Sequence, residues 1–461
     1  MCSFDGGCGK DEMTNDAVAP VLLTPGMALS EGTPTDRKRI LSWAMWDWGT
    51  QPFNTVITTF VFAVYITGSA FGPTNQTSMA LSISTAVAGL LVAALAPVLG
   101  QSADRSGRTV RNLRLLTWAV ALISASLFFV KPDPAYLWLG LGLLGVGSII
   151  SEIASVNYNS TIDQVATPRN VGRVSGFGWG MGYLGGIVVL LLLYFGLIAP
   201  EVGLFGVSNT DAMDIRVSMI ICGVWTLLFT IPTFLLLRDK PPSGAAAGIG
   251  LLGSYRELGR TIRRLWRTDR PTVYFLMASA LFRDGLAGVF AFGAVIAAGT
   301  FGFSAGDVVV FGAVANIVAG LATMAFGMLD DKIGPRIVIL TSLAALTLLG
   351  IGVFVFHDGG TGVFWALGLA MCVFVGPAQS ASRTFLARLI PHGQSGEIFG
   401  LYATTGRVVS FLSPAAFGLT IGLGHLITGK ENTQYWGILG IVAIIAAGFV
   451  VMLRVKPVAD R

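Results

Sequence analysis

The chain has 461 residues, of which 53% are hydrophobic and only 12% are charged, and its formal net charge is +5. Soluble domains carry about 25% charged residues, so this composition excludes a water-soluble protein of this size and makes lipid its main solvent. The basic residues lie beside long apolar stretches, which favours membrane lipids over nucleic acid as a partner.

Residues 1–36 are polar and acidic with almost no periodic apolar pattern, which predicts a disordered cytoplasmic tail. They lack the basic start, apolar middle and small-residue cleavage site of a signal peptide. We therefore expect the first hydrophobic segment to insert directly and to stay in the protein.

Twelve apolar segments follow, each long enough to cross a bilayer, which takes about 20 residues. They lie near residues 42–67, 78–100, 113–130, 136–158, 174–198, 215–237, 272–299, 306–328, 337–356, 362–382, 397–423 and 434–453. The predicted fold is an all-α membrane protein with twelve transmembrane helices in two six-helix bundles. We divide the chain into a tail, an N-terminal bundle, a linker, a C-terminal bundle and a second tail, at residues 1–36, 37–238, 239–271, 272–453 and 454–461.

The distribution of Lys and Arg predicts the orientation of these segments. With the N-terminal tail in the cytoplasm and the sides alternating, the cytoplasmic loops and tails hold 25 of the 30 basic residues. The external loops hold three, and Arg283 and Arg407 fall inside predicted helices. This bias requires an even number of spans, so it supports the count of twelve. Both termini are expected in the cytoplasm, and the membrane is expected to be the cell membrane.

The linker becomes strongly basic after a Pro- and Gly-containing start. Leu258, Ile262, Leu265 and Trp266 recur on one helical face among arginines. This pattern predicts a helix on the cytoplasmic membrane surface, where anionic headgroups attract the arginines. A solvated linker helix and a calmodulin-like partner site are the alternatives.

One loop motif occurs twice, which indicates duplicated halves of the kind that build many secondary transporters. A glycine, an acid, a base and a glycine stand at the same offsets after the second and eighth segments, as Gly100, Asp104, Arg105 and Gly107, and as Gly327, Asp331, Lys332 and Gly334. A second pair of glycines repeats at nearly the same spacing, as Gly172 and Gly176, and as Gly396 and Gly400. We predict that the loop glycines form tight turns and that each Asp caps or pairs with a neighbouring helix, as a cytoplasmic gate.

These motifs resemble a known family. The run from Gly100 to Arg108 resembles the loop signature of the major facilitator superfamily, and the run from Asp331 to Gly334 resembles its second-half copy. Shorter runs resemble one branch, the autophagy-related vacuolar effluxer-like permeases and their bacterial relatives, at residues 42–48, 172–176, 182–186 and 399–402. Over about residues 37–453, the resemblance implies the major facilitator fold and a fungal relative that exports amino acids from the vacuole. The stretch after Asp47 departs from the small polar pattern of the branch, which allows a different solute.

Polar residues recur at helical spacing in the first and fourth segments, which the resemblance places at the central pathway. They are Asp47, Gln51, Asn54 and Thr58, and Ser148, Glu152, Ser155 and Asn159. Charges at membrane depth cost about 2.5–3.5 kcal/mol on insertion scales, so we interpret them as functional candidates. A carboxyl buried without a fixed cation favours its protonated form, which makes Glu152 a candidate proton site. For Asp47 two roles are open: it either takes part in ion coupling or substrate binding, or it is a structural carboxylate that packs or caps a helix.

Three further charges lie inside predicted helices. Neighbours on a helix point about 100° apart, so Asp284 is expected to face the cavity while Arg283 contacts another helix. Arg407 is a candidate cation for Glu152 or for a substrate carboxylate. Together these groups suit a zwitterionic or anionic solute; structural charge pairing between helices is the alternative.

Small residues in the fifth segment predict close helix packing and a sliding surface between helices, at Gly178, Gly182 and Gly186.

We predict a secondary transporter that moves a small solute by alternating access. The first hypothesis is proton-coupled export of an amino acid or related metabolite; multidrug or metabolite efflux and uniport are alternatives. A membrane enzyme or sensor is the rival class, but His357, His392 and His425 lie far apart and no catalytic or metal-binding constellation is present. We therefore expect a monomeric protein that is not an enzyme, with no cofactor and no metal.

Overall fold

The computed structural model describes residues 29, 36–239, 251–390, 394–430 and 432–455, and most of these are helical. The main helices are α1 (Arg37–Pro52), α2 (Phe62–Ile66), α3 (Thr74–Ser106), α4 (Thr109–Ser126), α5 (Leu137–Ser160), α6 (Val171–Leu193), α7 (Met213–Leu236), α8 (Leu251–Thr268), α9 (Arg270–Gly299), α10 (Ala305–Ile333), α11 (Pro335–Val355), α12 (Gly360–Leu389), α13 (Ser395–Val409), α14 (Leu412–Thr428) and α15 (Gly437–Leu453).

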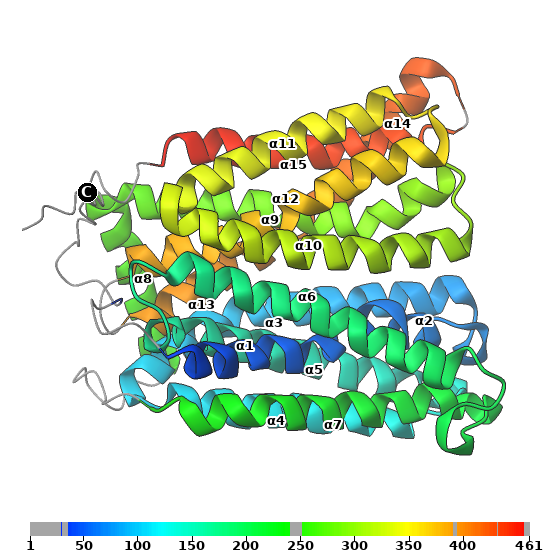
Figure 1. Cartoon of the computed structure of the whole chain (residues 1–461), viewed down its shortest axis with the longest axis horizontal. Helices are drawn as coiled ribbons and strands as arrows, with labels where there is room; N and C mark the ends of the chain where they lie inside the picture. The colour runs from blue at the N-terminus through cyan, green and yellow to red at the C-terminus, as the bar shows by residue number, and fades with distance from the viewer. Residues whose placement is uncertain (1–28, 30–35, 240–250, 391–393, 431, 456–461) are drawn as a thin grey trace, which may run out of the picture.

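The helices form two bundles that lie side by side (Figure 1). Helices α1 to α7 make one bundle and α9 to α15 make the other, and the two meet where α6 packs on α10 and α3 packs on α13. Eleven spans among the described residues are long and apolar enough to cross a bilayer. They correspond to all the predicted segments except the first. The predicted all-α membrane fold is confirmed.

The first predicted segment is not one regular helix. Helix α1 ends at Pro52, a π-helical stretch η1 (Phe53–Phe60) follows, and the short α2 completes the crossing. Proline has no backbone N–H and its ring clashes with the carbonyl one turn earlier. That carbonyl, on Trp48, instead accepts a hydrogen bond from the indole of Trp225 at 3.4 Å. The irregular backbone thus begins at the proline and is compensated by a neighbouring helix.

The eleventh predicted segment is also interrupted, between α13 and α14. The carboxylate of Asp284 accepts a hydrogen bond from the backbone N–H of Ser413 at 2.7 Å. This contact satisfies one of the free N–H groups at the start of α14. A side chain of α9 therefore supports the second half of this span.

Both repeated loops turn on a glycine in the left-handed region, as predicted. Gly107 ends α3 with φ of 64°, and Gly334 lies between α10 and α11 with φ of 85°. A side chain at these angles would be strained. In the second copy, Pro335 then begins α11, a position where its missing N–H costs nothing.

The linker contains the predicted helix, α8, which lies at one end of the molecule (Figure 1). Leu258 and Leu265 pack partly against the bundles, whereas Ile262 and Trp266 remain exposed. The Tyr255 hydroxyl donates to the carbonyl of Ala94 on α3 at 2.9 Å. The apolar face of α8 is therefore divided between the protein and the surface.

Candidate transport site

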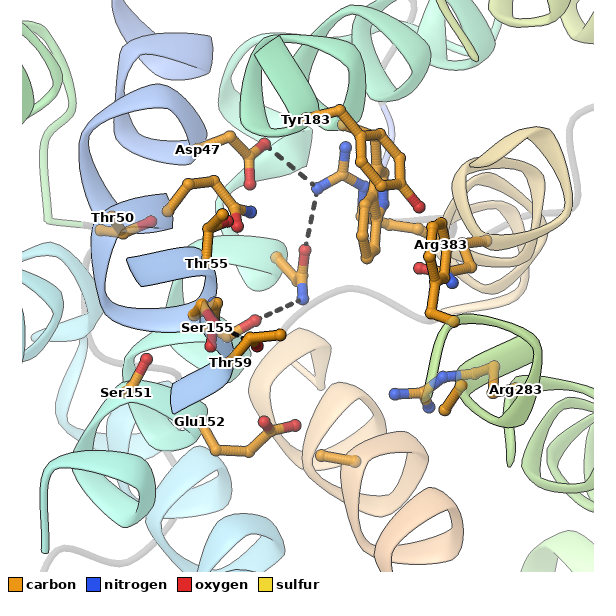
Figure 2. Close-up of a pocket in the computed structure, with 18 of the residues that line it drawn as sticks. Asp47, Thr50, Thr55, Thr59, Ser151, Glu152, Ser155, Tyr183, Arg283 and Arg383 are labelled. Carbon is orange, nitrogen blue, oxygen red and sulfur yellow. Dashed lines mark hydrogen bonds and ion pairs between the residues drawn. The ribbon is translucent and has the colours of Figure 1, made fainter. Parts of the chain in front are cut away.

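A cavity of about 590 Å³ lies between the two bundles (Figure 2). Residues of both bundles line it, mainly from α1, η1, α5, α6, α9, α12 and α13. Its polar lining includes Asp47, Thr50, Gln51, Asn54, Ser151, Glu152, Ser155, Asn159, Arg283, Asn316, Gln379 and Arg383. A chamber this size can hold a small solute.

The glycines of α6 explain why the polar residues of α1 face this cavity. A Cβ on Gly178 would lie 2.7 Å from Oδ2 of Asp47, and one on Gly182 would lie 2.9 Å from Nε2 of Gln51. Gly186 similarly leaves room for Thr55. The predicted close packing is therefore present, and it joins α6 mainly to α1 of the same bundle; Gly178 also faces the opposite bundle, where a Cβ would lie 3.2 Å from Nη2 of Arg383.

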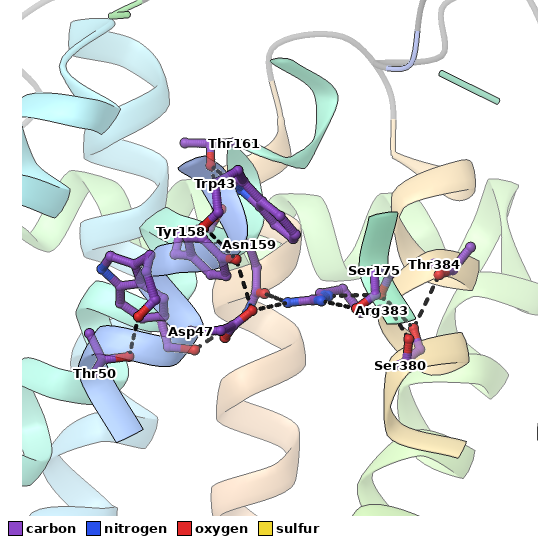
Figure 3. Close-up of polar contacts among 12 residues, drawn as sticks. Trp43, Asp47, Thr50, Tyr158, Asn159, Thr161, Ser175, Ser380, Arg383 and Thr384 are labelled. Carbon is purple, nitrogen blue, oxygen red and sulfur yellow. Dashed lines mark hydrogen bonds and ion pairs between the residues drawn. The ribbon is translucent and has the colours of Figure 1, made fainter. Parts of the chain in front are cut away.

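Arg383 on α12 joins the two bundles at one end of the cavity (Figure 3). Its Nε donates to the hydroxyl of Ser175 at 2.9 Å, its Nη2 to the carbonyl of Ser175 at 2.6 Å, and its Nη1 to Oδ1 of Asn159 at 3.2 Å. The same Nη1 lies 3.7 Å from Oδ2 of Asp47. The Arg383 side chain is only 4% exposed, so a buried cation of one bundle is held by groups of the other.

Asp47 is fixed on its other side by an aromatic cluster. The hydroxyl of Tyr158 donates to Oδ2 of Asp47 at 2.8 Å. The Tyr158 ring stacks against Trp43 and Trp46, with ring centroids 4.5 and 4.1 Å away. The indole of Trp43 donates to the Thr161 hydroxyl at 3.1 Å. These contacts hold the carboxylate toward Arg383.

Sequence reasoning missed Arg383 because it ended the tenth segment at residue 382 and assigned this arginine to a cytoplasmic loop. Helix α12 continues to Leu389. The helix continues beyond the end of the apolar run, because Arg383 and Arg388 in its last turns form hydrogen bonds with the opposite bundle. The only local signal is an arginine directly after a run of small residues.

Glu152 has a cation partner, contrary to the expectation of a carboxyl without one. Its Oε2 accepts a hydrogen bond from Nη2 of Arg407 at 2.6 Å, which joins α5 to α13 across the two bundles. Both side chains are partly exposed, 23% for Glu152 and 38% for Arg407. Of the two partners predicted for Arg407, Glu152 and a substrate carboxylate, the structure shows Glu152.

Arg283 contacts another helix, as expected, but it also lines the main cavity, whereas Asp284 lines only a smaller neighbouring cavity. Arg283 points into the cavity, opposite Glu152 (Figure 2). Its guanidinium lies 3.9 Å from the centroid of the Tyr402 ring and donates to the Tyr402 carbonyl at 2.9 Å. Among the described residues no carboxylate lies within ion-pair distance of it. Asp284 is buried and supports α14.

The repeated loops make matching contacts between the bundles. Oδ2 of Asp104 accepts a hydrogen bond from the backbone N–H of Glu397 at 3.0 Å, at the start of α13. In the second copy, Asp331 accepts from the backbone N–H groups of Gly172 and Arg173 at 2.7 and 3.0 Å, at the start of α6. Each carboxylate therefore caps a helix of the opposite bundle, where the helix dipole favours a negative charge.

Glycines bring the helices together beside these caps. A Cβ on Gly100 would overlap the carbonyl of Gly396, and one on Gly176 would lie 2.8 Å from Cα of Gly327. Arg108 and Lys332 are exposed at the same loops. We call the two caps, Asp104 on α13 and Asp331 on α6, the latch. The bundles touch closely at the end of the molecule that carries it.

Comparison with known proteins gives the family. A model described as "Vacuole effluxer Atg22 like" matches residues 166–457. The chain belongs to this family. It is 25% identical over 420 residues to "Uncharacterized MFS-type transporter YxiO" of Bacillus subtilis, with 89% of this chain and 94% of that protein covered. It is 25% identical over 270 residues to "Autophagy-related protein 22-1" of Neosartorya fischeri, with 54% of this chain and 43% of that protein covered.

Solved structures agree on the fold. A bacterial homologue of the iron transporter ferroportin in an outward-facing state has a TM-score of 0.66 at 17% identity, and the match covers 92% of this chain and 99% of that one. The proton:xylose symporter XylE has a TM-score of 0.62 at 16% identity, covering 91% and 94%. The protein is a multi-pass membrane transporter of the major facilitator superfamily, which is not a superfamily of enzymes, as predicted.

Proposed function

We propose that the protein is a secondary active transporter that exports a small solute carrying a carboxylate, an amino acid or related metabolite, by alternating access. The observation that supports this most directly is Arg283. Its guanidinium lies inside the cavity with no described carboxylate within ion-pair distance, so a solute carboxylate is its natural partner. Asn54, Gln379 and Asn316 offer further hydrogen-bonding groups in the lining of the same cavity.

The coupling ion proposed is the proton. Glu152 and Asp47 each face an arginine of the opposite bundle across the cavity. Protonation of either carboxyl removes the charge that holds the pair together, which favours separation of the bundles. Glu152 is the more exposed of the two, so it is the first candidate to exchange a proton with water in the cavity.

We also propose that the latch lies on the cytoplasmic side of the cell membrane, with both termini on that side. The bias of basic residues and the exposed arginines of α8 support this orientation. A monomer suffices, since the cavity is complete within one chain. Labelling of cysteines at Arg111 and Arg260 from the same membrane face is expected, and labelling from opposite faces would contradict the arrangement.

The function is tested by flux in proteoliposomes. A panel of amino acids, related carboxylates, their amides and unrelated neutral solutes is offered with and without an imposed pH gradient. We expect saturable flux only for carboxylate-bearing solutes, and acceleration by the gradient. Flux that ignores the gradient indicates uniport, and flux of solutes without a carboxylate contradicts the assigned solute class.

Arg283 provides the matched variant. Arg283→Gln is expected to weaken the apparent affinity for the carboxylate solute by about 10- to 100-fold, the value of one to two charge-assisted hydrogen bonds. Arg114→Gln is the control, because Arg114 lies against Trp118 on α4, outside the cavity lining. Equal affinity in the parent protein and Arg283→Gln would contradict the role of this arginine.

A further inference from the structure

Asp330 is a buried acid at the latch that the transport cycle described above does not use. It lies near the end of α10, directly before Asp331, and is only 1% exposed. Neither of its carboxylate oxygens accepts a hydrogen bond from the described residues. The Thr384 hydroxyl lies within reach, but it donates to the carbonyl of Ser380. Asp330 therefore lacks the partners that a buried carboxylate normally has.

Asp330 has fewer charged and hydrogen-bonding partners than the neighbouring Asp331. Nη2 of Arg388 on α12 lies 3.8 Å from Asp330 and 3.7 Å from Asp331. Asp331 also accepts two backbone hydrogen bonds from α6 and lies 3.9 Å from Nε of Arg173. One cation thus serves two adjacent acids, and only Asp331 has other partners. Two ionised carboxylates in this position repel each other, so the one without hydrogen bonds favours its neutral form.

Asp330 is also one of the positions at which the two copies of the loop differ. Asp104 and Asp331 occupy the same place in the repeat, so the counterpart of Asp330 is Ala103. Ala103 is equally buried, at 1% exposure. Because the first copy forms its cap with an alanine here, the fold does not need a carboxyl at this position.

Asp330 faces the contact between the bundles. A Cβ on Gly172 of α6 would lie 2.7 Å from Cβ of Asp330. Parting the bundles at the latch end would remove α6 from this carboxyl and admit water to it. Hydration favours the ionised form of an acid, so closure and protonation of Asp330 are linked.

We propose that Asp330 is a proton-binding site of the latch, neutral while the two bundles are in contact and ionised when they separate. Opening at this end then releases one proton, so acid on the latch side holds the transporter closed there. The groups that face this site are Asp331 on its own helix, Arg388 on α12 and Arg173 on α6. Arginine side chains are not deprotonated in proteins, which leaves the two acids as the groups that respond.

The test measures the latch directly and needs no solute, so it is independent of the proposed transport function. Spin labels at Arg111→Cys on α4 and Ile337→Cys on α11 report the distance between the bundles. Cys2 and Cys8 are replaced by serine, while the buried Cys222 and Cys372 remain. The full chain is reconstituted in lipid nanodiscs, and distances are recorded from pH 5 to pH 8.

In the parent protein, the ratio of open to closed molecules should rise with pH, by at most tenfold per pH unit for one proton. Asp330→Asn keeps the shape of the neutral acid, and Asp330→Ala copies the first repeat; both should lose the rise in the open fraction with pH that Asp330 causes. Any pH response that these variants keep should have the opposite sign, because protonation of Glu152 or Asp47 favours separation. Ala103→Asp should add a second pH response. A pH-independent parent, or Asp330 variants that respond as the parent does, would overturn the proposal.

Discussion

Replacement of Arg383 by methionine is expected to open the latch end of the cavity. The guanidinium donates three hydrogen bonds to Ser175 and Asn159 and lies 3.7 Å from the Asp47 carboxylate. All of these partners belong to the opposite bundle. Methionine fills similar space but makes none of these polar contacts, and it leaves Asp47 without its cation.

The expected cost of this substitution follows from the burial of Arg383 and Asp47. Removing one partner of a buried ion pair costs about 3–5 kcal/mol. Asp47 is 12% exposed and keeps the hydrogen bond from Tyr158, so we take the lower end of that range. About 3 kcal/mol corresponds to roughly a 100-fold change in the equilibrium between closed and open molecules, since a factor of ten is 1.4 kcal/mol.

Alkylation of a buried cysteine measures this equilibrium. Ala387 on α12 lies one turn beyond Arg383 and is 2% exposed. In a chain with Ala387→Cys and without Cys2 and Cys8, a water-soluble maleimide should react about 100-fold faster when Arg383 is methionine, provided that opening is fast. Adding Asp47→Asn removes the stranded charge and should restore part of the protection. Rates within twofold of the parent would refute the role of Arg383.

Three further predictions concern the other contacts. Glu152→Gln cannot release a proton, so gradient-driven flux should fall to background while solute exchange continues; parent-like flux under a pH gradient would exclude coupling through this side chain. Asp104→Asn loses a negative charge at the start of α13, which is worth about 1 kcal/mol, so flux should slow about fivefold with the same order of preference among solutes. Gly182→Val places Cβ 2.9 Å from Nε2 of Gln51 and displaces that side chain, so the melting temperature should fall, whereas Gly89→Val, where a Cβ meets nothing within 4 Å, should leave it nearly unchanged.

The sequence by itself determined the membrane class, the twelve crossings and the duplicated halves. Each of these depends on local features, namely the length of apolar runs, the placement of basic residues and a motif repeated at a fixed spacing. It also placed Asp47, Gln51 and Asn54 on the cavity side of the first crossing, because helical spacing is a local property too. Asp330 could have been noticed from the sequence, since the second copy of the loop has an additional acid where the first copy has Ala103.

Only the tertiary structure decided which charges meet. Glu152 and Arg407 are 255 residues apart in the chain, and Arg383 reaches Asp47 from the other bundle. No local pattern encodes such pairs, because they depend on how two bundles are placed against each other. For the same reason, the end of an apolar run did not mark the end of α12, whose last polar turns are stabilised by partners on the opposite bundle rather than by their own sequence.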